Sequence, residues 1–314
     1  MLSIQDLRSD SSLIIEKLKK RGLDVQSSVD EILALDSESR GIRTELERVQ
    51  SESNQAASKI GQLMREGKKE EAESIKAKTS EWKQEIKSLQ AEVDEKEGRL
   101  QAAILTLPNT PHDTVPAGKS AEDNEEVLLH GFKPELSDNA LPHWELAKKY
   151  DIIDFDLGVK VSGAGFPVYK GKGAILQRAL IQFFLNEAGK AGYTEIQAPL
   201  LVNESSGYGT GQLPDKEGQM YHVGMDDLYL IPTAEVPITN MFRDEMLKED
   251  QLPIKSCGYT PCFRREAGSY GAHVRGLNRL HQFDKVEIVQ IVHPDSSYDV
   301  LEDMSSYVQS LLQK

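Results

Sequence analysis

The 314-residue sequence predicts an α+β protein in which a long antiparallel helical hairpin precedes a body that contains antiparallel strands. Two observations predict this class. Apolar residues recur at steps of three and four over residues 29–107, with one interruption, which is typical of two paired helices. Two segments with strand character, 256–265 and 279–292, flank a glycine-rich connection, which is the pattern of a β-hairpin.

The first 110 residues predict a rod. A short amphipathic helix over 3–21 ends at Gly22, and the long apolar seam follows it. The seam is interrupted at 65–68 by a turn signal, so each long helix would extend roughly 50–55 Å. Residues 28–108 carry 13 Lys and Arg against 17 Asp and Glu, so the charge of the rod does not indicate RNA binding. Periodicity alone favours a spacer or a dimerisation arm.

The second part of the chain predicts a linker and a globular domain. Prolines 108, 111 and 116 end the second long helix and begin a polar stretch. Further on, 143–146 opens a helical segment, 173–191 has one apolar helical face, and 193–202 follows as a strand. We therefore expect a helical arm over 1–108, a linker over 109–140 and a catalytic domain over 141–314.

Composition limits the possible functions. The formal net charge of −14 disfavours binding to nucleic acid, so an RNA contact would need local basic patches. Such patches could use Lys170, Lys172, His273 and Arg275. Two cysteines and no signal-peptide pattern favour a reducing, cytoplasmic setting, and no apolar run is long enough for a membrane span. Cys257 and Cys262 would face opposite sides of one strand, so no metal site is predicted.

The predicted hairpin has the chemistry of a nucleotide site. Alternation places Arg264 and Glu266 on one face of the first strand. On the second strand the residues of one face are Arg279, His281, Phe283, Lys285 and Glu287. A guanidinium can grip phosphate oxygens, a carboxylate can accept from an exocyclic amine, and an aromatic ring can stack on a purine. A solvated hairpin with exposed ion pairs is the alternative.

The literal sequence resembles a known family. FRREAGSYG at 263–271 and RGLNRLHQFDKVE at 275–287 resemble motif 2 of class II aminoacyl-tRNA synthetases, and more narrowly seryl-tRNA synthetases. The resemblance implies that Arg264 is the catalytic residue that holds the α-phosphate of ATP. It also implies that Glu266 faces the adenine amine and Phe283 stacks on adenine. The implied ATP-binding set is Arg264, Arg265, Glu266, Arg279, Leu280 and Phe283.

A second segment resembles the serine-binding loop of the same family. Thr233 and Glu235 would share a face if the chain were extended, giving a hydroxyl and a carboxylate to one small ligand. The implied serine-binding set is Thr233, Ala234, Glu235, Arg264 and Glu287. Within 162–166 many family members carry Arg where this chain has Gly165, and no role is transferred to that position.

The resemblance implies a serine–tRNA ligase with a class II antiparallel sheet. Such an enzyme activates L-serine with ATP, assisted by Mg²⁺, and transfers serine to tRNA(Ser) and to tRNA(Sec). The helical arm would reach the tRNA, and 173–202 would form a homodimer interface as class II motif 1. Two alternative functions remain open. One is a synthetase-like ligase that charges another acceptor, and the other is a non-catalytic coiled-coil protein with a vestigial domain.

Class II domains of this kind continue past motif 2 into motif 3, which we do not find in the sequence. The remaining 294–314 has helical spacing only. We therefore expect the returning strand of motif 2 to lie at an open edge, with Phe283 uncovered on its second face. We also expect the 314-residue chain to activate serine poorly or not at all.

Overall fold

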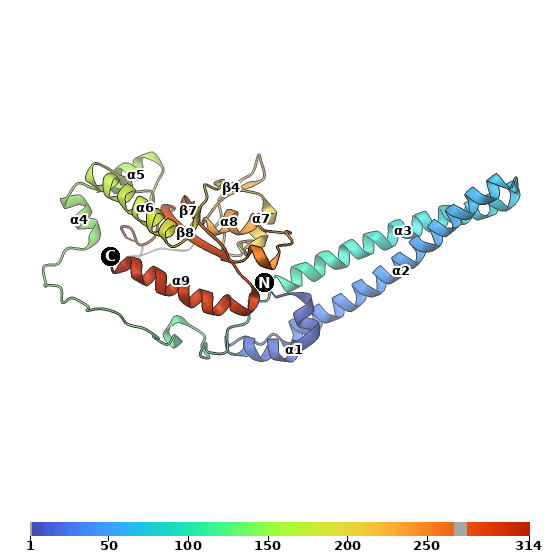
Figure 1. The fold of residues 1–314 in the computed structure, drawn as a ribbon, viewed down its shortest axis with the longest axis horizontal. Coiled ribbons are helices and arrows are strands. Elements are labelled where there is room, and N and C mark those ends of the chain that lie inside the picture. The colour runs from blue at the N-terminus through green and yellow to red at the C-terminus, as the bar shows by residue number, and fades with distance from the viewer. Residues whose placement is uncertain (1, 267–274) are drawn as a thin grey trace. The chain divides into compact units, whose positions relative to one another are not determined.

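The computed structural model describes residues 2–266 and 275–314 (Figure 1). The predicted glycine-rich connection at 267–274, with the basic candidate His273, lies outside the described residues. Contacts divide the chain into two compact units, Met1–Phe132 and Lys133–Lys314. The first unit is helical and the second contains antiparallel strands with helices, so the predicted fold class is confirmed.

The first unit begins with α1 (Ile4–Lys19), and Ser3 and Asp6 form a capping box at the start of this helix. Ser3 Oγ accepts from Asp6 N at 3.1 Å, and the Asp6 carboxylate accepts from Ser3 N at 3.3 Å. The apolar face of α1 packs against the base of the hairpin in a cluster that includes Leu7, Ile14, Leu18, Val29, Ile32 and Ile104. The predicted short amphipathic helix is confirmed.

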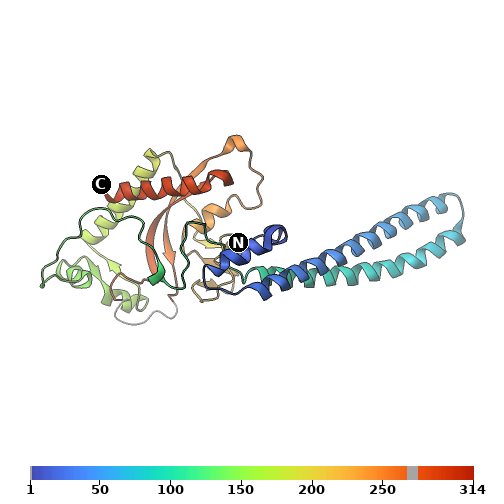
Figure 2. The same ribbon diagram turned by 90° about the horizontal axis from the view of Figure 1, so that it is seen from below.

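The rod consists of α2 (Gln26–Arg65) and α3 (Lys69–Ile104), which run antiparallel (Figure 2). Its seam buries apolar residues at the predicted spacing, among them Leu35, Leu46, Val49, Leu63, Ala72 and Val93. Ion pairs join the two helices beside the seam: Lys96 Nζ lies 2.5 Å from Glu38 Oε2, and Arg43 pairs with Glu97. With 40 residues α2 is about 60 Å long, slightly longer than expected.

The end of the first unit returns to the base of the rod. Gly118 N donates to Lys20 O at 2.9 Å, and a short 3₁₀ turn, η1 (Ala121–Asp123), follows. Residues 124–140 are exposed throughout, in keeping with the linker composition.

The second unit is organised around one long antiparallel pair, β7 (Ile254–Phe263) and β8 (Gln282–Ile291). Their register runs from Ile254↔Ile291 to Phe263↔Gln282, and β3 (Thr194–Glu195) joins β7 in parallel on its other side. Among the described strands the order is β3-β7-β8, so β8 lies at an edge, as expected for the returning strand.

The other described strands of this unit form two smaller sheets. β4 (Leu201–Val202), β6 (Leu228–Leu230) and β5 (His222–Val223) form an antiparallel sheet in the order β4-β6-β5. β1 (Ile153–Asp154) pairs antiparallel with β2 (Val168–Tyr169).

Helices cover the long pair. Ala188 of α6 (Lys172–Lys190) packs with Tyr193 and Cys257, and Tyr307 of α9 (Ser297–Leu312) joins this cluster. The shorter helical elements are α4 (His143–Lys149), α5 (Phe155–Val161), α7 (Glu204–Gly209), α8 (Glu235–Asn240), η2 (Glu249–Gln251) and η4 (Pro294–Ser296). None of the described helices is long and apolar enough to span a membrane.

Three strand predictions extend too far. The segment 193–202 is not one strand, because pairing breaks between β3 and β4 around Pro199, which has no N–H to donate. The first hairpin strand ends at Phe263, because the chain turns afterwards and Glu266 has a φ of +47°. The second strand begins at Gln282, so Arg279 and His281 precede it.

Candidate nucleotide and amino-acid site

The β7–β8 pair provides the main surface of the site. Phe283, Lys285 and Glu287 share one face of β8, and the β7 residues opposite them are Cys262, Thr260 and Gly258. This part of the predicted alternation is confirmed. Cys257 and Cys262 lie on opposite faces and are both buried, and burial raises the pKa of each thiol.

Arg264 is anchored at the end of β7 and reaches Phe283. Its backbone N donates to His281 O at 3.0 Å, and its Nε donates to Pro232 O at 3.4 Å. The guanidinium carbon lies 5.1 Å from the centre of the Phe283 ring, a cation–π contact. The structure thus brings together the two residues predicted to hold the α-phosphate and the adenine.

Glu266 and Arg279 meet across the mouth of the hairpin. Glu266 Oε2 lies 3.5 Å from Arg279 Nη1, and the two side chains are 13% and 55% exposed. Because Glu266 follows the end of β7, the strand alternation that paired it with Arg264 does not apply to it. Of the other ATP candidates, Arg265 is exposed, with its backbone N bound to Gln219 O at 2.8 Å, and Leu280 is buried.

Thr233 contacts Glu287, which lies on the same face of β8 as Phe283. Thr233 is buried, and its hydroxyl donates to Glu287 Oε2 at 2.8 Å. Lys285 Nζ contacts the same carboxylate oxygen. The expectation of an extended chain at 233–235 is wrong, because Ala234 is helical and α8 begins at Glu235, whose N donates to Thr233 Oγ1 at 3.1 Å. Ala234 is buried and Glu235 is exposed.

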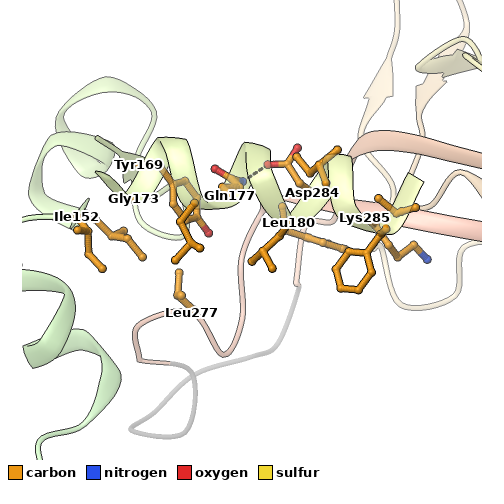
Figure 3. Close-up of a pocket in the computed structure, with 14 residues that line it drawn as sticks. Ile152, Tyr169, Gly173, Gln177, Leu180, Leu277, Asp284 and Lys285 are labelled. Atoms are coloured by element: carbon orange, nitrogen blue, oxygen red, sulfur yellow. Dashed lines mark hydrogen bonds between the residues drawn. The ribbon is translucent and has the colours of Figure 1, made fainter. Parts of the chain in front are cut away.

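A cavity of about 400 Å³ lies between α6 and the edge strand β8 (Figure 3). Phe283 and Lys285 line it together with Leu277 and Leu180. Figure 3 shows Gln177 of α6 hydrogen-bonded to Asp284. Asp284 also accepts from Tyr259 at 2.7 Å, and burial together with this carboxylate raises the pKa of Tyr259 to about 12.

His281, which directly precedes β8, packs with two aromatic side chains and forms an aromatic layer with them. Tyr221 Oη lies 2.8 Å from His281 Nδ1, and the Phe166 ring stacks on the imidazole at 5.3 Å. Gly165 allows this layer: its φ is +84°, its O accepts from His281 N at 2.9 Å, and a Cβ there would lie 2.2 Å from His281 Cδ2. Position 165 therefore supports the hairpin by close backbone packing.

Comparisons with known proteins show the family of this chain. Residues 1–111 match the seryl-tRNA synthetase N-terminal domain, and 221–314 match the tRNA synthetase class II core domain (G, H, P, S and T). A serine–tRNA ligase of Salinibacter ruber is 51% identical over 312 residues, covering 99% of this chain and 73% of the relative. The chain belongs to the seryl-tRNA synthetase family.

Further relatives support the membership. A serine–tRNA ligase of Trichormus variabilis is 43% identical over 327 residues, covering 100% of this chain and 74% of the relative. The structure of seryl-tRNA synthetase from Pyrococcus horikoshii complexed with ATP is similar with a TM-score of 0.81 and 33% identity. That alignment covers 100% of this chain and 74% of the other. The resemblance inferred from motif 2 is confirmed.

The sequence did not predict two features of this seryl-tRNA synthetase family member. The alternation placed Lys285 beside Glu287, but nothing predicted that it would contact the carboxylate assigned to serine. The packing of Gly165 on His281 joins residues far apart in sequence, and the unusual glycine was its only signal.

The donor set fits a magnesium ion that arrives with a nucleotide. Among the described residues, no three His, Cys, Asp or Glu side chains form a cluster that could hold a metal ion. Mg²⁺ commonly needs only one or two carboxylates, because waters and substrate phosphates supply its other ligands. Glu266 and Glu287 are two of the carboxylates of the described site.

Proposed function

We propose that this chain is a serine–tRNA ligase that uses ATP to activate L-serine on the face of the β7–β8 pair. The observation that carries the proposal is the convergence of two residue pairs on that face. Arg264 and Phe283 form the nucleotide half, and Thr233 and Glu287 form the amino-acid half. Both pairs belong to a chain that is 51% identical to a serine–tRNA ligase.

ATP binding would exchange internal contacts for contacts to the nucleotide. The Arg264 guanidinium leaves the Phe283 ring for two α-phosphate oxygens, and adenine stacks on the ring. Glu266 separates from Arg279 and accepts from the adenine amine, while Arg279 and Arg265 turn to the phosphates. Leu280, buried below them, supports this surface from the protein side.

Serine would bind where the Glu287 carboxylate already holds two hydrogen-bond donors. The serine ammonium takes the place of Lys285 Nζ on Glu287, and Thr233 keeps the carboxylate oriented. Glu235 and the Ala234 backbone close this half of the site. A site that hydrogen-bonds a substrate hydroxyl can reject analogues without it by about 10⁴-fold.

The reaction needs alignment and charge stabilisation more than a protein base. A serine carboxylate oxygen attacks the α-phosphorus, the bond to the bridging oxygen breaks, and pyrophosphate leaves with that electron pair. Arg264 stabilises the charge that develops on the α-phosphate. Mg²⁺, when bound with ATP, neutralises phosphate charge. The terminal ribose hydroxyl of tRNA then attacks the seryl carbonyl and AMP leaves.

The finer assignments follow the same proposal. The acceptors are tRNA(Ser) and tRNA(Sec), contacted by the arm over 1–108, which a linker over 109–140 joins to a catalytic domain over 141–314. The protein acts in the cytoplasm as a homodimer. Ile175, Leu176 and Leu180 support a dimer, because α6 exposes 47–57% of each of these apolar residues.

Serine-dependent exchange of labelled pyrophosphate into ATP tests the proposal. We expect exchange with serine to exceed exchange with alanine or threonine at equal concentrations. The result is read as a ratio, because a ratio does not depend on the absolute turnover of this chain. Equal rates with all three amino acids would favour a ligase for another acceptor. Exchange with none of them, together with no ATP binding, would favour the non-catalytic alternative.

A further inference from the structure

Two residues of α4 hold the segment that leads into β8. His143 Nε2 accepts a hydrogen bond from Leu277 N at 2.8 Å. The neighbouring Trp144 ring lies 4.8 Å from the guanidinium carbon of Arg275, a cation–π contact. Thus two consecutive residues of one helix contact a segment more than 130 positions later, inside the same unit.

The backbone of the segment is shaped to receive the imidazole. Gly276 has a φ of +75°, and a Cβ at this position would lie 2.1 Å from His143 Nε2. Only a glycine here lets the ring approach the Leu277 amide to hydrogen-bond distance. The Trp144 ring meets the imidazole edge-on, with centroids 5.0 Å apart, and so braces its orientation.

The contact depends on an acceptor on the ring. The Leu277 amide N–H donates to the Nε2 atom of His143. The contact is therefore a directed hydrogen bond, which a ring of equal size without an acceptor would not reproduce.

The held segment carries two parts of the nucleotide half. Arg279, two residues after Leu277, reaches Glu266 at 3.5 Å. The Leu277 side chain lines the cavity that Phe283 also lines. A shift of the Leu277 backbone would move both the start of β8 and the root of the Arg279 side chain.

We propose that His143, braced by Trp144, is a positioning residue for ATP: it fixes segment 275–279 so that Arg279 and Phe283 meet the nucleotide. His143 acts through Leu277 and does not touch the substrate. This role rests on the proposed function for its kinetic effect. The contact itself can be measured in the free protein.

Three variants test the role. His143→Phe keeps an aromatic ring and removes the acceptor, and His143→Gln places a side-chain oxygen near the position of Nε2. His222→Phe makes the same change on β5, where His222 pairs with Asp227, and serves as the matched control. The measurements are amide hydrogen exchange of the free chain and the KM values for ATP and serine in pyrophosphate exchange.

In His143→Phe, we expect the Leu277 amide to exchange about tenfold faster, while amides in β7 keep their rates. The KM for ATP should rise about tenfold, the scale of a partly buried donor that loses its acceptor, with the KM for serine within about twofold. His143→Gln should recover most of both effects, and His222→Phe should show neither.

Several results would overturn the proposal. One is an unchanged Leu277 amide in His143→Phe. Another is a faster amide with an unchanged KM for ATP, which would leave the contact without a role in the site. A third is equal loss in the Gln and Phe variants, or an equal rise of both KM values, which would indicate general damage. A wild-type chain that shows neither serine-dependent exchange nor ATP binding would instead refute the proposed function, and the amide measurement would still decide whether the contact holds.

Discussion

At the scale of single residues, the site is a set of charged groups that already have partners. The Arg264 guanidinium makes a cation–π contact with the Phe283 ring. Arg279 forms an ion pair with Glu266, and Lys285 forms an ion pair with Glu287. Each partner is itself assigned to a part of the substrates, so binding exchanges one favourable contact for another. The gain from each exchange is smaller than a new contact would give, because the earlier contact is lost.

Arg264 gives the first prediction. Arg264→Ala should lower serine-dependent pyrophosphate exchange by at least about 10²-fold, because a preorganised charge at the reacting phosphate is lost. Arg48→Ala, which removes an exposed arginine paired with Glu45 and Glu52 on the arm, is the control and should leave exchange unchanged. Near-normal exchange by Arg264→Ala would remove its assignment to the α-phosphate.

The residue assignments show what local sequence can and cannot predict. The resemblance to motif 2 implied Arg264, Phe283 and Glu287 as one site, and strand alternation placed Phe283 and Glu287 on one face of β8. Alternation failed at Glu266, where a positive φ ends the strand geometry. The His143–Leu277 hydrogen bond joins segments that only the tertiary fold brings together, so no local pattern could predict it.

At the scale of elements, the hairpin depends on neighbours that are distant in sequence. The loop around Gly165 supports His281 from below, and α4 holds segment 275–277. The sequence predicted the long helices well, because their apolar periodicity extends over many turns. The short strands β3 to β6 carry two or three residues each, too few for any periodic signal.

Gly165 gives the second prediction. Gly165→Ala should lower the free energy of unfolding by about 2–3 kcal/mol, because it adds a clash with His281 to the cost of a positive φ. Gly192→Ala is the control: φ is also +84° there and nothing lies within 4 Å of the added Cβ, so it should cost only about 1 kcal/mol. Urea unfolding measures both, and equal losses would contradict the packing role.

Asp36 gives a pH prediction for the arm. Its carboxylate is 4% exposed and joins α1 to α2 through Arg8, with Arg40 3.2 Å away. The hydrogen bond from Arg8, opposed by burial and aided by the charges of both arginines, lowers the pKa of Asp36 below its usual 3.8. Because the folded pKa is the lower one, the stabilisation is present above pH 3.8 and is lost as pH falls through the folded value.

Asp36→Asn should therefore lower the free energy of unfolding by about 1–2 kcal/mol at pH 7. The difference from the wild type should stay constant down to about pH 5 and shrink toward zero below pH 3.8. Asp30→Asn, in the first turns of the same helix, should have little effect at any pH. A difference that persisted unchanged at the lowest pH would contradict the ion-pair explanation.

At the scale of the whole molecule, the two units divide the proposed reaction. All residues that we propose for serine activation lie in the second unit, and the rod belongs to the first. We expect that the arm can be shortened without disturbing its base. Removing 47–92 and joining Leu46 to Val93 by a short glycine-rich turn would keep the α1 cluster and the Glu38–Lys96 pair.

This shortened protein should activate serine within about twofold of the wild type and transfer it to tRNA(Ser) at least about tenfold more slowly, because an extended binding surface is lost. Pyrophosphate exchange and aminoacylation measure the two steps. A parallel loss of both activities would mean that the arm is structural support for the catalytic unit.

Binding of a non-hydrolysable seryl-adenylate analogue tests the central claim most directly, because one molecule fills both halves of the site without turnover. We predict that the chain binds the seryl analogue on the order of 10⁴-fold more tightly than the alanyl analogue, since serine differs from alanine by its hydroxyl. Arg264→Ala should weaken binding of the seryl analogue, whereas Arg48→Ala should leave this binding unchanged. Equal affinity for the two analogues, or no binding of the seryl analogue, would contradict a serine-activating site on the β7–β8 pair.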